Sequence, residues 1–147
     1  MNKIGLGFND CKKINSNLIY ASINGFGDAG PYSNAPAYDH VVQAMAGATN
    51  IQADNDEPAY IKTLLCDKIT AYTVCQSLSS ALFKRERTGD ADRLNLSMID
   101  SAVFFLWPDG MMNHTLLDDD VVTLPPLTKS YNLYLSLIHI SEPTRPY

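Results

Sequence analysis

Residues 18–39 have the sequence LIYASINGFGDAGPYSNAPAYD. The run Leu18–Ile23 is largely apolar and favours β structure, which predicts a buried strand. The run Gly25–Pro36 is crowded with glycine, proline, serine and asparagine, which is typical of a long loop. Asp39 then precedes closely spaced apolar residues and Gly47 follows them, so we expect a short helix between these two positions.

A long helix over Asp67–Arg87 is the clearest element further along the chain. Apolar residues recur there at helical spacing, which indicates one face of a helix. Cations in the last turn suit the helix dipole, and Gly89 is a suitable stop. The polar residues 48–61 are expected to be irregular. The apolar face consists of Ala71, Val74, Cys75, Leu78, Ala81 and Leu82, and the cations are Lys84, Arg85 and Arg87.

A second strand and a further helix follow. Apolar and polar residues alternate over Arg93–Met98, which indicates a strand with one buried face. Asp100–Trp107 is an apolar helix pattern that Pro108 should end or bend. Strands that alternate with helices favour the α/β class.

The composition excludes several classes of protein. The chain has 147 residues, which favours one domain, and its formal net charge is −5. The longest basic run is Lys84–Arg87, so no nucleic-acid partner is expected. No apolar stretch reaches the ~18 residues of a membrane span, and residues 1–10 have no signal-peptide core. We therefore expect a protein with no membrane partner.

The three cysteines are an odd number and form no C-x-x-C motif. This pattern indicates neither a disulfide framework nor a zinc site, and it fits a reducing cytoplasm. His40 and His114 have no ligand-like spacing. The acidic run Asp118–Asp120 lacks the glycine and glutamate of a calcium loop. No metal site is expected.

The C-terminal residues differ in character. The sequence of Leu135–Arg145 can be back-translated into the transposase-end adapter used in sequencing libraries. We therefore expect residues 135–147 to be a non-native tail and residues 1–134 to be the domain itself. No function is assigned to His139.

Residues Gly25–Gly30 match the dinucleotide pattern G-x-G-x-x-G after a strand. Such a site needs a helix to open within the loop so that its amides face the pyrophosphate. Here Pro31–Pro36 follows instead, and Asp28 would place a negative charge beside the phosphates. The sequence therefore favours a flexible loop with left-handed glycines over an NAD site.

Three other residues at helix starts have a structural and a chemical interpretation. Asp67 could cap the long helix, or it could be a nucleophile kept ionised by the helix N-terminus. Asp39 is expected to be the N-cap of its own helix. No histidine lies near Cys66 in the sequence, so a small buried thiol is favoured over a cysteine nucleophile.

Taken together, these motifs resemble the family III coenzyme A transferases of the CaiB/BaiF type. The resemblance covers roughly residues 1–122, in order and without large gaps. Asp67 takes the place of the family's catalytic aspartate. The matching motifs are Gly27-x-x-Gly30-Pro31-Tyr32, Ala37-Tyr38-Asp39, Gln43-Ala44, Gly47 and Leu94–Ala102.

The resemblance implies a nucleotide-binding-like (Rossmann-type) domain with parallel strands and helices. The family enzyme is about three times longer, so this chain is expected to be a central fragment that is inactive alone. The implied reaction moves coenzyme A between an acyl-CoA and a carboxylic acid, through an Asp67 mixed anhydride and an Asp67-CoA thioester. Pro36, Ala37, Tyr38 and Asp39 would lie along coenzyme A. The family forms interlocked homodimers and needs no tightly bound cofactor or metal.

Two alternatives stay open. An α-methylacyl-CoA racemase of the same superfamily needs a histidine where this chain has Tyr38, and a phenol is a poor base at neutral pH. A truncated, non-catalytic module is the other alternative.

Overall fold

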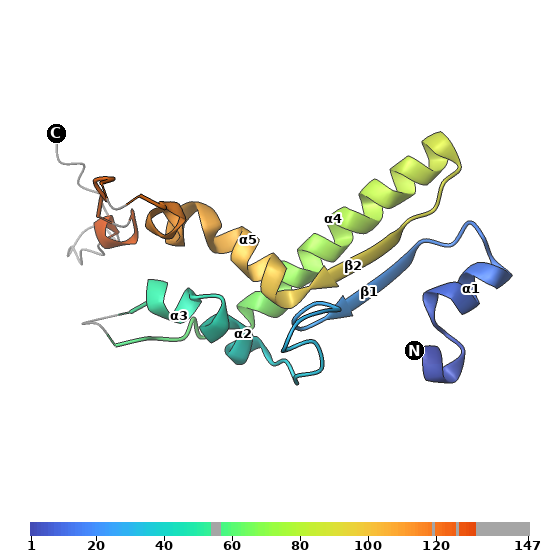
Figure 1. Ribbon diagram of the computed structural model, residues 1–147, viewed down its shortest axis with the longest axis horizontal. Helices are drawn as coiled ribbons and strands as arrows, with labels where there is room; N and C mark the ends of the chain where they lie inside the picture. The colour runs from blue at the N-terminus through green and yellow to red at the C-terminus, as the bar shows by residue number, and fades with distance from the viewer. Residues whose placement is uncertain (54–56, 119, 126, 132–147) are drawn as a thin grey trace, which may run out of the picture. The chain divides into compact units, whose positions relative to one another are not determined.

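Two parallel strands, β1 (Tyr20–Asn24) and β2 (Arg93–Ser97), form the sheet in the part of the chain that the computed structural model describes (Figure 1). Tyr20 pairs with Arg93 at one end of the register and Asn24 pairs with Ser97 at the other. Parallel strands need a long crossover, and here helices occupy it. The expected α/β class is confirmed.

The structure describes residues 1–53, 57–118, 120–125 and 127–131. The expected non-native tail at 135–147 and the expected domain end at 134 lie outside these residues. The chain divides into two units, Met1–Phe105 and Leu106–Tyr147.

A short helical segment precedes the sheet. It consists of the 3₁₀ turn η1 (Asn2–Ile4) and helix α1 (Phe8–Ile14). The Phe8 ring meets the Tyr20 ring edge-on at 5.7 Å between centroids, and the Tyr20 hydroxyl donates to the Leu6 carbonyl at 2.9 Å. These contacts fix the segment to the first residue of β1.

Two short helices follow the loop after β1. Helix α2 (Asp39–Met45) confirms the expected helix at Asp39. Helix α3 (Ala48–Ile51) lies where the sequence predicted irregular structure, so that prediction is wrong over these residues. Gly47 is the reason: its φ of 84° reverses the chain, and its carbonyl accepts from the Asn50 and Ile51 amides.

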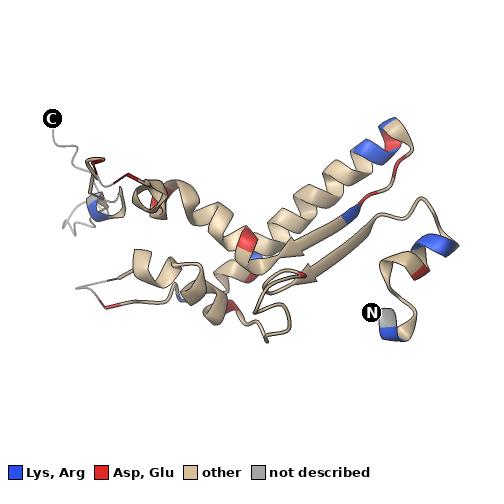
Figure 2. Ribbon diagram, in the orientation of Figure 1, with Lys and Arg blue, Asp and Glu red and all other residues tan. Residues whose placement is uncertain are grey.

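The long helix α4 (Leu65–Thr88) confirms the predicted element, and Gly89 ends it with a φ of 78°. Figure 2 shows the basic residues gathered in its last turn. The predicted apolar face is wrong in part: Ala81 is buried, whereas Ala71, Cys75 and Leu82 are exposed. Within the described residues α4 packs on β2 and α2, and these short elements cover a small part of a 24-residue helix.

Helix α5 (Met98–Gly110) begins directly after β2. The Ser97 hydroxyl accepts from the Asp100 amide at 3.1 Å and donates to the Asp100 carboxylate, which is a reciprocal helix cap. The prediction that Pro108 ends or bends the helix is wrong as to the end, because α5 continues to Gly110. Pro108 lies in the last turn, where its missing N–H removes one hydrogen bond near a terminus.

The second unit contains two 3₁₀ turns, η2 (Met112–Thr115) and η3 (Leu127–Ser130). The Asn113 side chain donates to the Leu124 carbonyl at 2.7 Å. No helix among the described residues is long and apolar enough to cross a membrane.

The most tightly enclosed part of the described chain is the contact between α2 and the start of α4. The largest fully buried side chains are Gln43, Val42 and Cys66, and all three come from these two helices. A polar side chain therefore lies at the centre of the best-packed region.

Candidate active site

Asp67 lies in the first turn of α4 and is exposed. Its carboxylate makes no hydrogen bond or ion pair with any other described residue. The helix N-terminus carries partial positive charge, which stabilises a carboxylate in the ionised form. The alternative that Asp67 caps α4 finds no support, because no capping hydrogen bond comes from its side chain.

Asp39 provides the cap of α4 instead. It is 5 % exposed, and its Oδ2 accepts the Asp67 backbone N–H at 2.9 Å. The expectation that Asp39 is the N-cap of its own helix is wrong: Tyr38 is the N-cap of α2 and Asp39 is the first helical residue. Because the chain folds α2 against α4, the carboxylate reaches an unpaired amide 28 residues away.

Gln43 holds the other oxygen of the same carboxylate. Its Nε2 donates to Asp39 Oδ1 at 2.6 Å, and it also lies 3.0 Å from the Thr63 carbonyl and 3.2 Å from the Ile61 carbonyl. Its Oε1 accepts the Ile61 N–H at 3.1 Å. Gln43 thus joins α2 to the segment that enters α4.

The glycine loop after β1 brings the residues expected along coenzyme A to the start of α2. A Cβ at Gly25 would lie 2.1 Å from the Ala37 Cβ, so this close approach requires glycine. No helix opens between Gly25 and Tyr38, so this loop lacks the helix N-terminus that faces the pyrophosphate in a dinucleotide motif. Pro36 and Tyr38 are exposed, and Ala37 between them is half-buried.

Asp28, which argued against a phosphate at this loop, has its own partners. Its carboxylate accepts from Asn24 Nδ2 at 2.9 Å and lies 3.5 Å from the Arg93 guanidinium. Asn24 also accepts the Gly27 N–H at 2.6 Å, with Gly27 at a φ of 89°. The loop is therefore fastened to both strands of the sheet.

Comparison with known proteins decides the family. The model of CoA-transferase family III matches residues 1–134. The chain belongs to this family. The resemblance found from the motifs is confirmed, and with it the Rossmann-type α/β character.

Relatives of this family III chain are much longer. It is 39 % identical over 108 residues to the acetyl-CoA:oxalate CoA-transferase of Acetobacter aceti, covering 72 % of this chain and 28 % of that protein. It is 38 % identical over 104 residues to a probable fatty acyl-CoA transferase of Mycobacterium tuberculosis, covering 70 % and 26 %. A crystal structure of a CaiB/BaiF family protein from Brucella suis matches with a TM-score of 0.71 and 34 % identity, covering 75 % of this chain and 29 % of that one.

An aromatic cluster lies beside Asp39 in this family III chain. The Tyr38 and His40 rings are stacked at 5.9 Å between centroids with an interplanar angle of 13°, and His40 meets Tyr60 edge-on at 6.4 Å. Local sequence patterns do not predict this cluster, because Tyr60 comes from a different segment of the chain than Tyr38 and His40. Among the described residues no group of three or more potential ligands could hold a metal ion.

Cys66 is a buried thiol, as the sequence favoured. It is completely enclosed, and burial raises its pKa to about 11, with smaller contributions from the Asp39 and Asp67 carboxylates. At neutral pH the group is a neutral thiol, whereas the thiolate is the nucleophilic form. Cys66 is therefore not an available nucleophile at this turn, whereas the Asp67 carboxylate is exposed.

A thiol reagent at about pH 8 is expected to modify Cys75 and leave Cys66 unmodified, because Cys66 is enclosed and protonated whereas Cys75 is exposed on the same helix. Iodoacetamide labelling followed by peptide mass spectrometry measures both residues in one sample. Equal labelling rates for the two thiols would contradict this description of the site.

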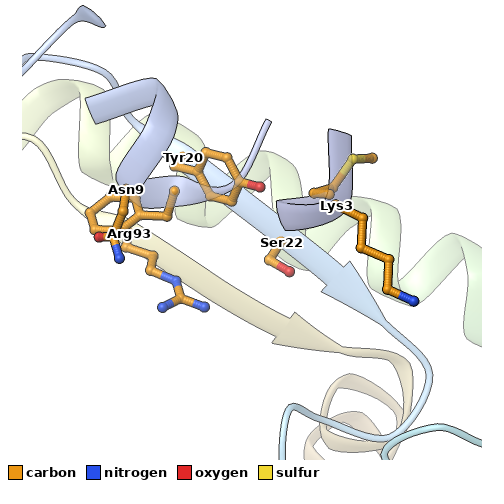
Figure 3. A pocket seen from close by; sticks show the side chains of 7 residues that line it. Lys3, Asn9, Tyr20, Ser22 and Arg93 are labelled. Atoms are coloured by element: carbon orange, nitrogen blue, oxygen red, sulfur yellow. The ribbon is translucent and has the colours of Figure 1, made fainter. Parts of the chain in front are cut away.

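A cleft of about 480 Å³ lies between α1 and the sheet (Figure 3). Lys3 and Arg93 give it positive charge, and Arg93 also lies 5.5 Å from the Phe8 ring centre. No local pattern in the sequence predicts that these residues gather. The remaining lining residues are Met1, Asn9, Tyr20 and Ser22.

Proposed function

We propose that the complete protein transfers coenzyme A from an acyl-CoA to a carboxylic acid, with Asp67 as the covalent nucleophile. The observation that carries this proposal is the exposed Asp67 carboxylate at the N-terminus of α4, which has no partner among the described residues and whose backbone amide is held by buried Asp39. The names of the relatives support the class of substrate, since they act on acetyl-CoA with oxalate and on fatty acyl-CoA. Coenzyme A is a substrate here, and no tightly bound cofactor is part of the proposal.

The first half of the reaction loads the enzyme. An Asp67 oxygen attacks the thioester carbonyl carbon of the donor, the C–S bond breaks, and a mixed anhydride and the CoA thiolate form. The thiolate then attacks the Asp67 carbonyl carbon, which releases the donor acid as a carboxylate. The enzyme now holds an Asp67-CoA thioester.

The second half reverses these steps with the acceptor. The acceptor carboxylate attacks the Asp67 thioester, expels the CoA thiolate and forms a second anhydride. The thiolate attacks the acceptor's acyl carbon, which yields the new acyl-CoA and restores the Asp67 carboxylate. No net proton or electron is needed.

The elements around Asp67 suit this sequence of steps. The partial positive charge at the start of α4 favours the ionised carboxylate and the developing negative charge on its carbonyl oxygen. Coenzyme A is proposed to lie along the exposed Pro36 and Tyr38, over Ala37 and the buried Asp39. The neutral thiol of Cys66 does not compete with Asp67 for the acyl group.

We further propose an interlocked homodimer in the cytoplasm. Phe104 and Phe105 of α5 are 83 % and 57 % exposed in the described chain. Large exposed apolar side chains that lie together are typical of a surface that packs against another part of the protein or a second subunit. The cysteines Cys11, Cys66 and Cys75 are all free thiols, which fits a reducing compartment.

Incubation of the complete protein with acetyl-CoA, or with a long-chain fatty acyl-CoA, and oxalate tests the activity. The expected products are oxalyl-CoA and the donor's free acid in equal amounts, measured by liquid chromatography and mass spectrometry. Release of free coenzyme A without a new thioester would indicate a hydrolase and contradict the proposal.

A further inference from the structure

The buried amide of Gln43 is unusual for a side chain at the centre of a packed region. Gln43 is 2 % exposed, and its amide group bonds both to Asp39 on its own helix and to the segment Ile61–Thr63 that leads into α4. No buried side-chain nitrogen or oxygen among the described residues lacks a partner. A fully paired polar group in a core specifies geometry, because each bond fixes one neighbour in place.

We propose that Gln43 is a positioning residue that sets the place of the Asp67 carboxylate. This inference rests on the proposed function of Asp67. Gln43 acts on the Asp67 turn by two routes: through the Asp39 carboxylate, and through the segment that leads into α4.

The first route runs through Asp39. A carboxylate with one bound oxygen can rotate, so a single bond to the Asp67 amide would leave its plane undetermined. Gln43 holds Oδ1 at 2.6 Å while Oδ2 accepts the Asp67 N–H at 2.9 Å, and the two bonds together fix the plane. The first turn of α4 is therefore tied to α2 (Figure 1).

The second route runs through Ile61 and Thr63. Gln43 accepts the Ile61 N–H at 3.1 Å and lies within hydrogen-bond distance of the Thr63 carbonyl at 3.0 Å. The Thr63 carbonyl also accepts the Leu65 N–H at 2.9 Å, at the first residue of α4. Gln43 thus holds both the entry to the helix and the cap inside its first turn.

The choice of residue follows from the partners. Three acceptors and one donor face the side chain at position 43. A glutamate would offer no donor when ionised and would place a second charge against Asp39. A methionine has similar length but offers no donor. An amide satisfies both kinds of partner without charge.

The test uses Gln43→Met in the complete protein, with acetyl-CoA and oxalate as substrates. A displaced nucleophile should lower kcat by about 10²-fold, while the KM for acetyl-CoA stays the same. The matched control is Gln76→Met, which changes an exposed glutamine on α4 and should leave both constants unchanged. A wild-type kcat in Gln43→Met would overturn the inference.

A double variant shows whether Gln43 acts through its partner. If the first route dominates, Asp39→Asn combined with Gln43→Met should lose no more kcat than Asp39→Asn alone, since the second change removes an interaction that is already lost. Additive losses would contradict the route through Asp39.

Gln43→Glu keeps the test decisive if Gln43→Met fails to fold. A protonated glutamic acid can donate to Asp39 and accept from Ile61, so the kcat of Gln43→Glu relative to wild type should recover as the pH falls. A ratio that does not change with pH would contradict the inference. If the wild type itself transfers no coenzyme A, the proposed function fails. If the wild type and the Gln43 variants all transfer coenzyme A at the same rate, the proposed function stands and only the role of Gln43 is contradicted.

Discussion

Replacing Asp67 with alanine is expected to lower CoA transfer by at least about 10³-fold. No other described group at this turn can take over the covalent role, because Cys66 is buried and its pKa is raised to about 11. Binding of acetyl-CoA should persist, since the Asp67 side chain makes no hydrogen bond with any other described residue. Steady-state rates give the first result and calorimetric titration with acetyl-CoA gives the second.

The matched control for this variant is Asp90→Ala, which removes an exposed carboxylate just beyond the other end of α4. It should transfer coenzyme A at the wild-type rate. Turnover of Asp67→Ala within tenfold of wild type would contradict the role of Asp67 as nucleophile.

Replacing Asp39 with alanine should weaken the start of α4 more than any surface change. Asp39 is buried and its carboxylate accepts two hydrogen bonds, so its loss removes one bond of the Gln43 amide and leaves the Asp67 N–H unpaired. We expect a cost of about 3 kcal/mol. Amide hydrogen exchange in residues 61–70 should therefore be faster by about 10²-fold, and CoA transfer should fall by a similar factor.

Asp92→Ala is the control for Asp39→Ala. Its carboxylate also accepts a hydrogen bond, from Lys84 at 2.7 Å, but the pair is at the surface. Surface pairs contribute about 0–1 kcal/mol, so exchange in residues 61–70 should not change. Unchanged exchange in Asp39→Ala as well would show that this carboxylate does not cap α4.

Much of the fold could be predicted from local patterns. The helix from Leu65 follows from apolar spacing and from its C-terminal glycine, and the two strands follow from their β-favouring runs. Residues 48–51 were missed because their helix depends on the left-handed Gly47 rather than on periodicity. The cap at Ser97 had a signal, since Ser97 and Asp100 have capping-box spacing.

The site could be predicted in part. Motif resemblance predicted roles for Asp67 and Asp39, but the hydrogen bond between them joins residues 28 positions apart and depends on the packing of α2 on α4. Local propensity favoured Asp39 as the cap of its own helix, because it takes no account of a partner that lies far away in the sequence. Gln43 belonged to a matching motif, but no role followed for its side chain, because a lone glutamine in a helix is usually a surface residue.

Oxygen-18 in both oxygens of the acceptor carboxylate tests the central claim most directly. In the proposed reaction one acceptor oxygen becomes the bridge of the second anhydride, and attack of the thiolate on the acyl carbon leaves that oxygen on Asp67. After many turnovers of the complete protein, peptide mass spectrometry should find oxygen-18 in the Asp67 side chain and in no other residue. Turnover that leaves the Asp67 peptide unlabelled would contradict covalent catalysis by Asp67.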